Sequence, residues 1–252
     1  MRTVPRLLLA ASALVALSGC SSDSSVAPVA QPTTLDAALG ELSLQTIMPS
    51  SVTTSSPLAL AAIAPAGCAY NAVSQSFACG TVTGNGFTMT SGFTLLTAAG
   101  APQAAFDQAT TAAIRTTTAL TSSQVMNGET FAADMTQTLT LSGLLSGVHT
   151  LNGTQLMHIS TTPATGSGTT TTISTAITDL VLPDQPGAGH YPKSGTIAQN
   201  ISMPVRGTLP AFTASTLVTF NGTSKVTVVI SSGGLSQRCT LDLAGSGLPT
   251  CS

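Results

Sequence analysis

From residue 87 onward, apolar and hydroxylated side chains alternate along the chain. Phenylalanine, methionine and leucine alternate with threonine over 87–95, and the same period of two recurs over 135–142, 212–220 and 226–230. An apolar face opposite a Ser/Thr face is typical of strands that are buried on one side. Asn-Gly pairs, which favour two-residue hairpin turns, stand near or between these runs at 85–86, 127–128, 152–153 and 221–222. The pattern predicts about ten antiparallel strands, most of them joined by short connections.

Antiparallel strands with one apolar face must cover that face, either by stacking two sheets or by curling one sheet. We therefore predict an all-β fold, an antiparallel meander curled into an open or closed barrel, with a β-sandwich as the alternative. Aromatic residues make up only 4% of the chain, which argues against the aromatic girdles of an outer-membrane barrel. Two short helices are also expected, at 34–44 behind the capping residue Thr34 and at 103–113 behind Pro102.

The first twenty residues have the parts of a secretory leader. Arg2 and Arg6 precede an apolar run over 7–17, which at about eleven residues is too short for a membrane-spanning helix. The run ends in Leu17-Ser18-Gly19-Cys20, which resembles the lipobox of bacterial lipoproteins. The resemblance implies cleavage before Cys20, a diacylglycerol thioether on its sulfur and an acylated amino group. The alternative is an ordinary leader, with Cys20 as a plain thiol.

The leader sets the expected organisation of the chain. We predict a signal peptide at 1–19, a flexible tether at 20–33 that carries the lipidated Cys20, and a single β-rich domain at 34–252. Two or three acyl chains would anchor the protein stably, because each buried CH₂ contributes about 0.8 kcal/mol. The expected location is the cell envelope. By the same resemblance, Ser21 after the cysteine implies the outer membrane in a cell with two membranes.

Charge is scarce along the chain. Of 7 basic and 9 acidic residues, the predicted leader removes Arg2 and Arg6, which leaves a formal charge of 5 − 9 = −4. No basic patch is present, which argues against nucleic acid as a partner and against electrostatic docking on anionic lipid.

Four further cysteines are expected to form disulfides, because their number is even in an exported chain. They are Cys68, Cys79, Cys239 and Cys251, and three pairings are open. We favour Cys68–Cys79 with Cys239–Cys251, since a turn signal lies midway between the members of each pair. In a hairpin the two cysteines would then face each other within disulfide reach.

The common catalytic and cofactor motifs are missing from the sequence, so no cofactor is expected, and the histidines are candidates for a ligand site. If Asn152-Gly153 forms a two-residue turn, His149 and His158 lie on one sheet face, diagonal neighbours about 7–8 Å apart. They could then share a metal with His190 or Asp179. The structural alternative is a pair of half-exposed histidines without a ligand.

Three other features of the sequence are candidates for binding or catalysis. His190-Tyr191 lies in a Pro/Gly-rich stretch over 183–192, and such loops often carry binding residues. Glu129 and Asp134 are candidate paired carboxylates for glycoside hydrolysis. The Thr-rich strand faces are candidate arrays for sugar or ice, although threonine also favours strands for its own conformational reasons.

These features predict a membrane-anchored envelope lipoprotein with a non-catalytic β domain, a binding or structural module. The first alternative is a carrier of an apolar ligand in a curled sheet. The second is a hydrolase of envelope polymers that uses Glu129, Asp134 or the histidines. The expected partners are the membrane, through the lipid, and an envelope protein, a glycan or an apolar ligand.

Overall fold

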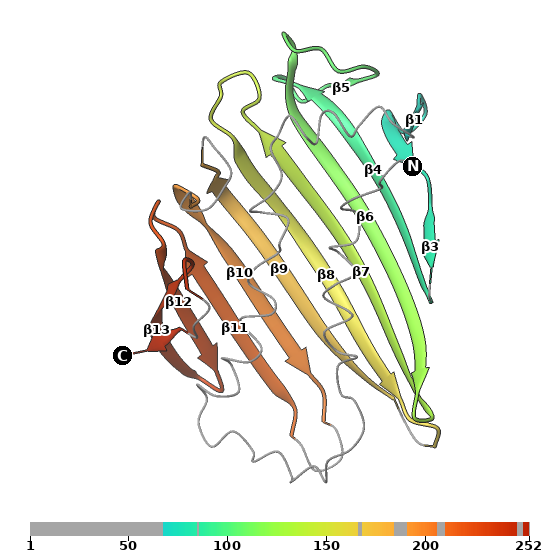
Figure 1. Cartoon of the computed structure of the whole chain (residues 1–252), viewed down its shortest axis with the longest axis vertical. Coiled ribbons are helices and arrows are strands. Elements are labelled where there is room, and N and C mark those ends of the chain that lie inside the picture. The colour runs from blue at the N-terminus through green and yellow to red at the C-terminus, as the bar shows by residue number, and fades with distance from the viewer. Residues whose placement is uncertain are drawn as a thin grey trace, which may run out of the picture. The chain divides into compact units, whose positions relative to one another are not determined.

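The computed structural model describes residues 68–84, 86–165, 168–183, 191–205, 210–245 and 249–251. Within these ranges the chain forms strands and connecting turns, without a helix, so the all-β prediction is confirmed (Figure 1). The predicted leader, the tether with Cys20 and the helix at 34–44 lie outside the described residues.

Fourteen strands are described, more than the roughly ten expected. Nine have eight or more residues: β4 (Phe87–Thr97), β6 (Thr111–Met126), β7 (Glu129–Ser142), β8 (Thr150–Thr162), β9 (Thr169–Val181), β10 (Ser194–Met203), β11 (Phe212–Thr219), β12 (Lys225–Ser232) and β13 (Leu235–Asp242). The others are short: β1 (Cys68–Asn71), β2 (Ser76–Cys79), β3 (Val82–Gly84), β5 (Pro102–Gln103) and β14 (Thr250–Cys251).

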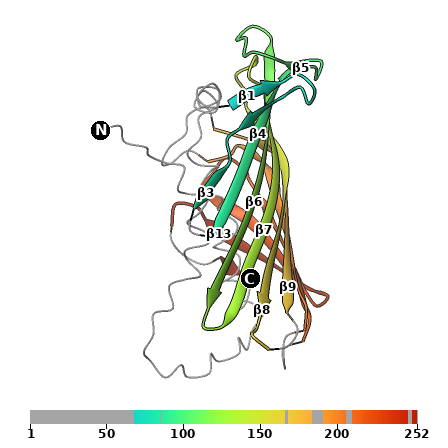
Figure 2. The same cartoon turned by 90° about the vertical axis from the view of Figure 1, so that its right-hand side faces the viewer.

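All the strands belong to one antiparallel sheet. Its order is β1-β2-β4-β6-β7-β8-β9-β10-β11-β12-β13-β14, with β3 and β5 paired to β4, so it is the predicted meander. Figure 2 shows that the sheet is twisted and curved, with β1 and β3 at one edge and β13 at the other on the same side. Among the described strands the two edges do not pair, so the sheet is open. The closed barrel and the β-sandwich are both wrong for this part of the chain.

The sheet has two chemically different faces. We call the face that carries Phe93, Val218 and Val228 the inner face, and the opposite one the outer face. Inner-face apolar side chains are mostly buried, and Val218 and Val228 have no exposed surface. The outer face carries mainly threonine and serine, as the alternation predicts. One cluster on the inner face joins Phe93, Leu95 and Ile114, and Phe77 stacks on Phe93 with ring centroids 4.4 Å apart.

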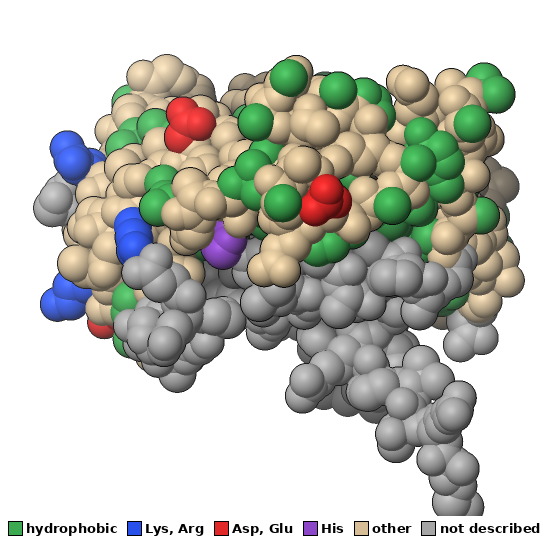
Figure 3. Space-filling model, turned by 90° about the horizontal axis from the view of Figure 1, so that it is seen from above, with side chains coloured by type: hydrophobic (Ala, Val, Ile, Leu, Met, Phe, Trp, Pro, Cys, Tyr) green, Lys and Arg blue, Asp and Glu red, His purple; other side chains and the backbone are tan. Residues whose placement is uncertain are grey.

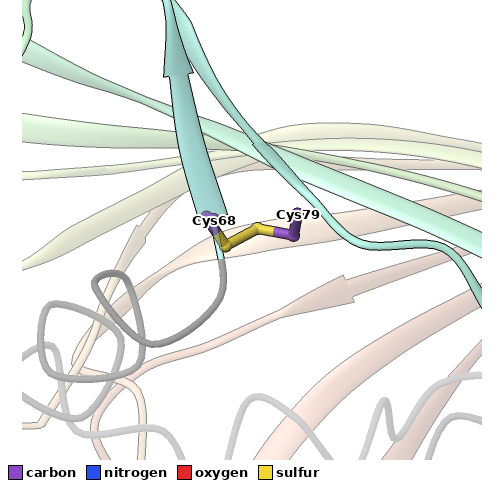
Figure 4. The surroundings of a disulfide bond; sticks show 2 residues. All are labelled: Cys68 and Cys79. Carbon is purple, nitrogen blue, oxygen red and sulfur yellow. A yellow bond between two sulfur atoms is a disulfide. The ribbon is translucent and has the colours of Figure 1, made fainter.

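Both predicted disulfides are formed, one at each edge of the sheet. Cys68–Cys79 joins β1 to β2 (Figure 4), and Cys239–Cys251 joins β13 to β14. The paired cysteines are direct cross-strand partners, with Cα atoms 4.0 and 3.9 Å apart. Each bond therefore fastens a short terminal strand onto its neighbour. Short, covered edges protect a sheet from pairing with other chains.

Three of the four Asn-Gly pairs lie within the described residues: Asn221-Gly222 is in the connection between β11 and β12, and the other two have opposite outcomes. Asn127-Gly128 forms the two-residue turn between β6 and β7, with φ of 53° and 80°, as an Asn-Gly hairpin requires. Asn152-Gly153 is not a turn but lies inside β8. There the Asn152 Oδ1 accepts a hydrogen bond of 2.7 Å from the backbone N–H of Asp179 in β9, at a shift in strand register. The amide thus supports an irregular strand instead of a hairpin.

The helix expected at 103–113 is also wrong. Gln103 pairs with β4, and β6 begins at Thr111. Asp107 organises the connection, because its carbonyl accepts from the N–H of Thr111 and its carboxylate from the N–H of Ala109. The expected helix is therefore divided between β6, which takes residues 111–113, and a turn that the Asp107 hydrogen bonds hold, so its alanines do not make it helical.

Candidate functional site

The structure brings together two of the candidate residues, Asp134 and His158, on the outer face. Asp134 of β7 lies directly opposite His158 of β8 in the strand register. On the other side, His158 is paired with Thr172 of β9, and its Nδ1 lies 3.1 Å from the Thr172 Oγ1. A carboxylate, an imidazole and a hydroxyl therefore stand in one row across three strands. Asp134 is exposed and His158 half-buried, so the row is accessible from solvent.

The row contains the residue types of a nucleophile, a base and an orienting acid. A base activates a hydroxyl when the two are within hydrogen-bond reach, and the Thr172–His158 contact meets that condition. Asp134 and His158 are neighbours by strand pairing. The imidazole ring makes its hydrogen bond to Thr172. The arrangement is that of a polar surface row in which the imidazole is held by a threonine.

The other predicted pairs are not brought together. His149 immediately precedes β8, nine residues before His158, so the two lie roughly 30 Å apart along the strand direction and on opposite faces. The shared-metal hypothesis is wrong for this pair because Asn152-Gly153 does not turn the chain. Glu129 and Asp134 are five residues apart on β7 and therefore point to opposite faces. They cannot flank one glycosidic bond.

Of the two candidates in the loop over 183–192, the structure describes Tyr191. Tyr191 is half-buried and precedes β10, while His190 lies outside the described residues. Asp179, the proposed additional ligand, is in the bulged part of β9, with φ of 48°. Its backbone N–H is bound by Asn152. Within the described ranges no three residues of the His, Cys, Asp and Glu types come close enough to hold a metal ion.

Sequence reasoning missed two shallow grooves on the outer face. One, of about 470 Å³, crosses β9 to β13 and is lined mainly by small hydroxylated side chains, among them Ser202, Ser215 and Ser231. The second, of about 270 Å³, lies over β7 to β10, and both include Ser174 and Asn200. Neither is lined by a charged side chain. The small size of these residues is visible in the sequence. Their position side by side on neighbouring strands depends on the strand register, which the sequence does not give.

The outer face also carries a regular threonine row. Six threonines occupy directly paired positions on six neighbouring strands: Thr178, Thr196, Thr219, Thr227, Thr240 and Thr250. The predicted hydroxyl array is thus aligned across the strands as well as along them. Its binding of sugar or ice stays a prediction.

A second row of polar side chains crosses the inner face, in which Gln199 and Thr216 are buried and the other members are half-buried. We call it the inner polar row; its members are Ser91, Thr118, Gln137, Gln155, Thr175, Gln199 and Thr216, each paired with the next across seven strands. The Gln137 Nε2 donates to the Gln155 Oε1 at 3.2 Å, and the Gln199 Nε2 lies 3.5 Å from the Thr175 Oγ1. Gln199 is only 3% exposed, and its Oε1 has no hydrogen-bond partner. Glutamine at an apolar position of the alternation was the signal in the sequence for this row.

Comparison with known proteins does not assign the chain to a class. No family model, no curated protein and no solved structure matches it. In the part of the chain that the structure describes, no helix is long and apolar enough to cross a membrane.

Proposed function

We propose that this chain is a lipid-anchored protein of a bacterial cell envelope, whose β domain is a non-catalytic binding or structural module. The observation that carries the proposal is Leu17-Ser18-Gly19-Cys20 at the end of a positively charged, apolar leader. That context suits diacylglyceryl transfer to Cys20 and cleavage before it. The lipid would hold the domain at a membrane, and the tether at 20–33 would let it extend away from the surface.

The disulfides support export of the chain. Cys68–Cys79 and Cys239–Cys251 are formed in the fold, and such bonds persist in oxidising compartments outside the cytosol. The composition of the outer face supports a binding or structural role. Its grooves and threonine row present many neutral hydroxyl groups in fixed positions, which suits neutral polar partners better than charged ones.

The row of Asp134, His158 and Thr172 favours a second candidate, a hydrolase of envelope polymers. The 3.1 Å contact between His158 and Thr172 is the specific observation in its favour. A Thr172→Val variant tests the hydrolase, because an enzyme that used this hydroxyl as its nucleophile would lose all turnover.

Substitution of the lipidated cysteine tests the main proposal. Wild-type protein expressed in a bacterium should incorporate radiolabelled palmitate and sediment with membranes, whereas Cys20→Ala should do neither. Ser21→Asp is the matched control, since it keeps the lipid and should change only the membrane that receives the protein. Palmitate incorporation into Cys20→Ala at the wild-type level would reject the proposal.

A further inference from the structure

The inner face is an apolar surface that the described strands leave without a second layer. All fourteen strands belong to one sheet, so none of them crosses that face. Yet Leu95 of β4, Leu141 of β7 and Val218 of β11 are only 2%, 4% and 0% exposed. An apolar sheet face is stable in water only when another element packs on it. A further occupant must therefore cover the inner face: another part of this chain, a second copy of it or an apolar ligand.

The chain enters the sheet beside this face, at Cys68. This residue begins β1 and is bonded to Cys79 of β2 (Figure 4). Its side chain packs against the inner-face cluster of Phe93, Leu95 and Ile114. The disulfide holds Cys68 directly opposite its partner, so the contact with the cluster is fixed covalently. The segment that precedes Cys68 therefore starts next to an apolar cluster on the inner face.

The segment that leads into Cys68 is itself apolar. Residues 58–64, which precede the described residues, read Leu-Ala-Leu-Ala-Ala-Ile-Ala, and no Asp, Glu, Lys, Arg or His occurs over 42–106. The last residue of this run is four positions before Cys68, so it lies within about 14 Å of the cysteine. The outer face of β4 carries threonines at 88, 90 and 94. Within this reach the inner-face cluster is therefore the apolar surface on which the run can be buried.

The charges on the neighbouring strands suit an uncharged occupant. In Figure 3 the Lys and Arg side chains lie at the left of the view, over the later strands, and none is seen at the right, over the early strands. Strands β1, β2, β4 and β6 contain one charged residue, Arg115. Its side chain is exposed on the outer face, opposite Thr94 and Thr140. The inner face of these four strands therefore carries no charge.

We propose that residues 58–64 pack on the inner face over β4 and β6 and cover the cluster of Phe93, Leu95 and Ile114. The short connection to Cys68 keeps the run at an effective concentration in the millimolar range. A second copy or a free ligand would in addition lose translational and rotational freedom on binding, so the run is favoured over both. It becomes part of the core and closes this part of the inner face to an apolar ligand. The proposal does not depend on the lipid anchor.

Photo-cross-linking tests where the run lies. The experiment uses the complete mature chain with Cys20→Ala, which removes the lipid, and places the photoreactive residue p-benzoylphenylalanine at position 60 instead of Leu60. The matched control carries it at position 29 instead of Val29, in the predicted tether. After irradiation, mass spectrometry of peptides from the reduced protein locates the cross-links. We expect links from position 60 to inner-face residues of β4 and β6 in the same chain, and no link from position 29 to the sheet.

Urea unfolding of the same chain measures what the run contributes to stability. Leu60→Ser should lower the urea midpoint by about 1 M, because it removes a buried apolar side chain, whereas Val29→Ser should leave the midpoint unchanged. Far-UV circular dichroism checks that each variant is folded. An unchanged midpoint for Leu60→Ser would overturn the inference. So would a link from position 60 to a second chain, which would identify a dimer, or the absence of any link to the sheet, which would leave the face to a ligand.

Discussion

Replacing Gln199 with methionine should make the domain more stable, which is unusual for a substitution in a buried position. Gln199 lies on the inner face of β10 between Ile197 and Ile201, opposite Thr216. Its side chain is 3% exposed and its Oε1 has no hydrogen-bond partner. Methionine has nearly the same length and shape, so it fills the same space without the polar oxygen.

The expected gain follows from two opposing terms. A buried acceptor left without a partner costs about 1–3 kcal/mol, and the substitution removes that cost. It also removes the bond from the Gln199 Nε2 to Thr175, but at 3.5 Å this bond is long and contributes at the low end of the usual range, about 0.5 kcal/mol. The net expectation is a free energy of unfolding about 1 kcal/mol higher, or a Tm increase of about 2–4 °C for a domain of this size.

Urea unfolding followed by far-UV circular dichroism, with the disulfides intact, measures this difference. Gln137→Met is the matched control, because it removes the donor to the Gln155 Oε1 and should lower the free energy of unfolding by about 1 kcal/mol. If Gln199→Met instead destabilises the domain by as much as the control does, the Gln199 oxygen has a partner in solution. The reasoning from an unsatisfied acceptor would then be refuted.

Three further variants test one disulfide and two glycines of the sheet by the same assay. Replacing Cys239 and Cys251 with serine opens a loop of sequence separation 12 and should cost about 3 kcal/mol; an unchanged urea midpoint would show that β14 does not depend on the bond. Gly195→Ala should cost more than about 2 kcal/mol, because φ is 105° and the new Cβ would overlap the carbonyl oxygen of Asp179. Gly128→Ala should cost only about 1 kcal/mol, since φ is 80° but the nearest atom is 3.9 Å away. Equal losses for the two alanine variants would contradict the steric part of this argument.

The sequence was sufficient to predict which side chains face inward and which cysteines pair. Alternation identified the strands because each has one buried face, as in β4, where Phe87, Met89 and Phe93 all lie on the inner side. The cysteines were predictable because a short hairpin leaves a cross-strand partner little freedom. Both results depend on local geometry, which a single sequence contains.

The composition of the outer-face site could not be predicted, because it depends on contacts between strands. Asn152-Gly153 has the same local signal as Asn127-Gly128, yet one lies within a strand and the other forms a turn. The choice was decided by the pairing of β8 along its length with β7 and β9. Because Asn152-Gly153 was predicted to be a turn, His158 was expected beside His149. The structure pairs it with Asp134 instead.

The register of this sheet is determined by features other than its alternation. A slip of two residues between β8 and β9 would keep every apolar side chain on the inner face, so the period of two does not forbid it. Such a slip would set the half-buried Gln155 opposite Ile173 or Ile177 instead of Thr175, so its amide would face hydrocarbon in place of a hydroxylated side chain. At the two edges, the disulfides fix the pairing of β1 with β2 and of β13 with β14 covalently. The inner polar row thus disfavours slips in the middle of the sheet, where the chain has no covalent bond to prevent them.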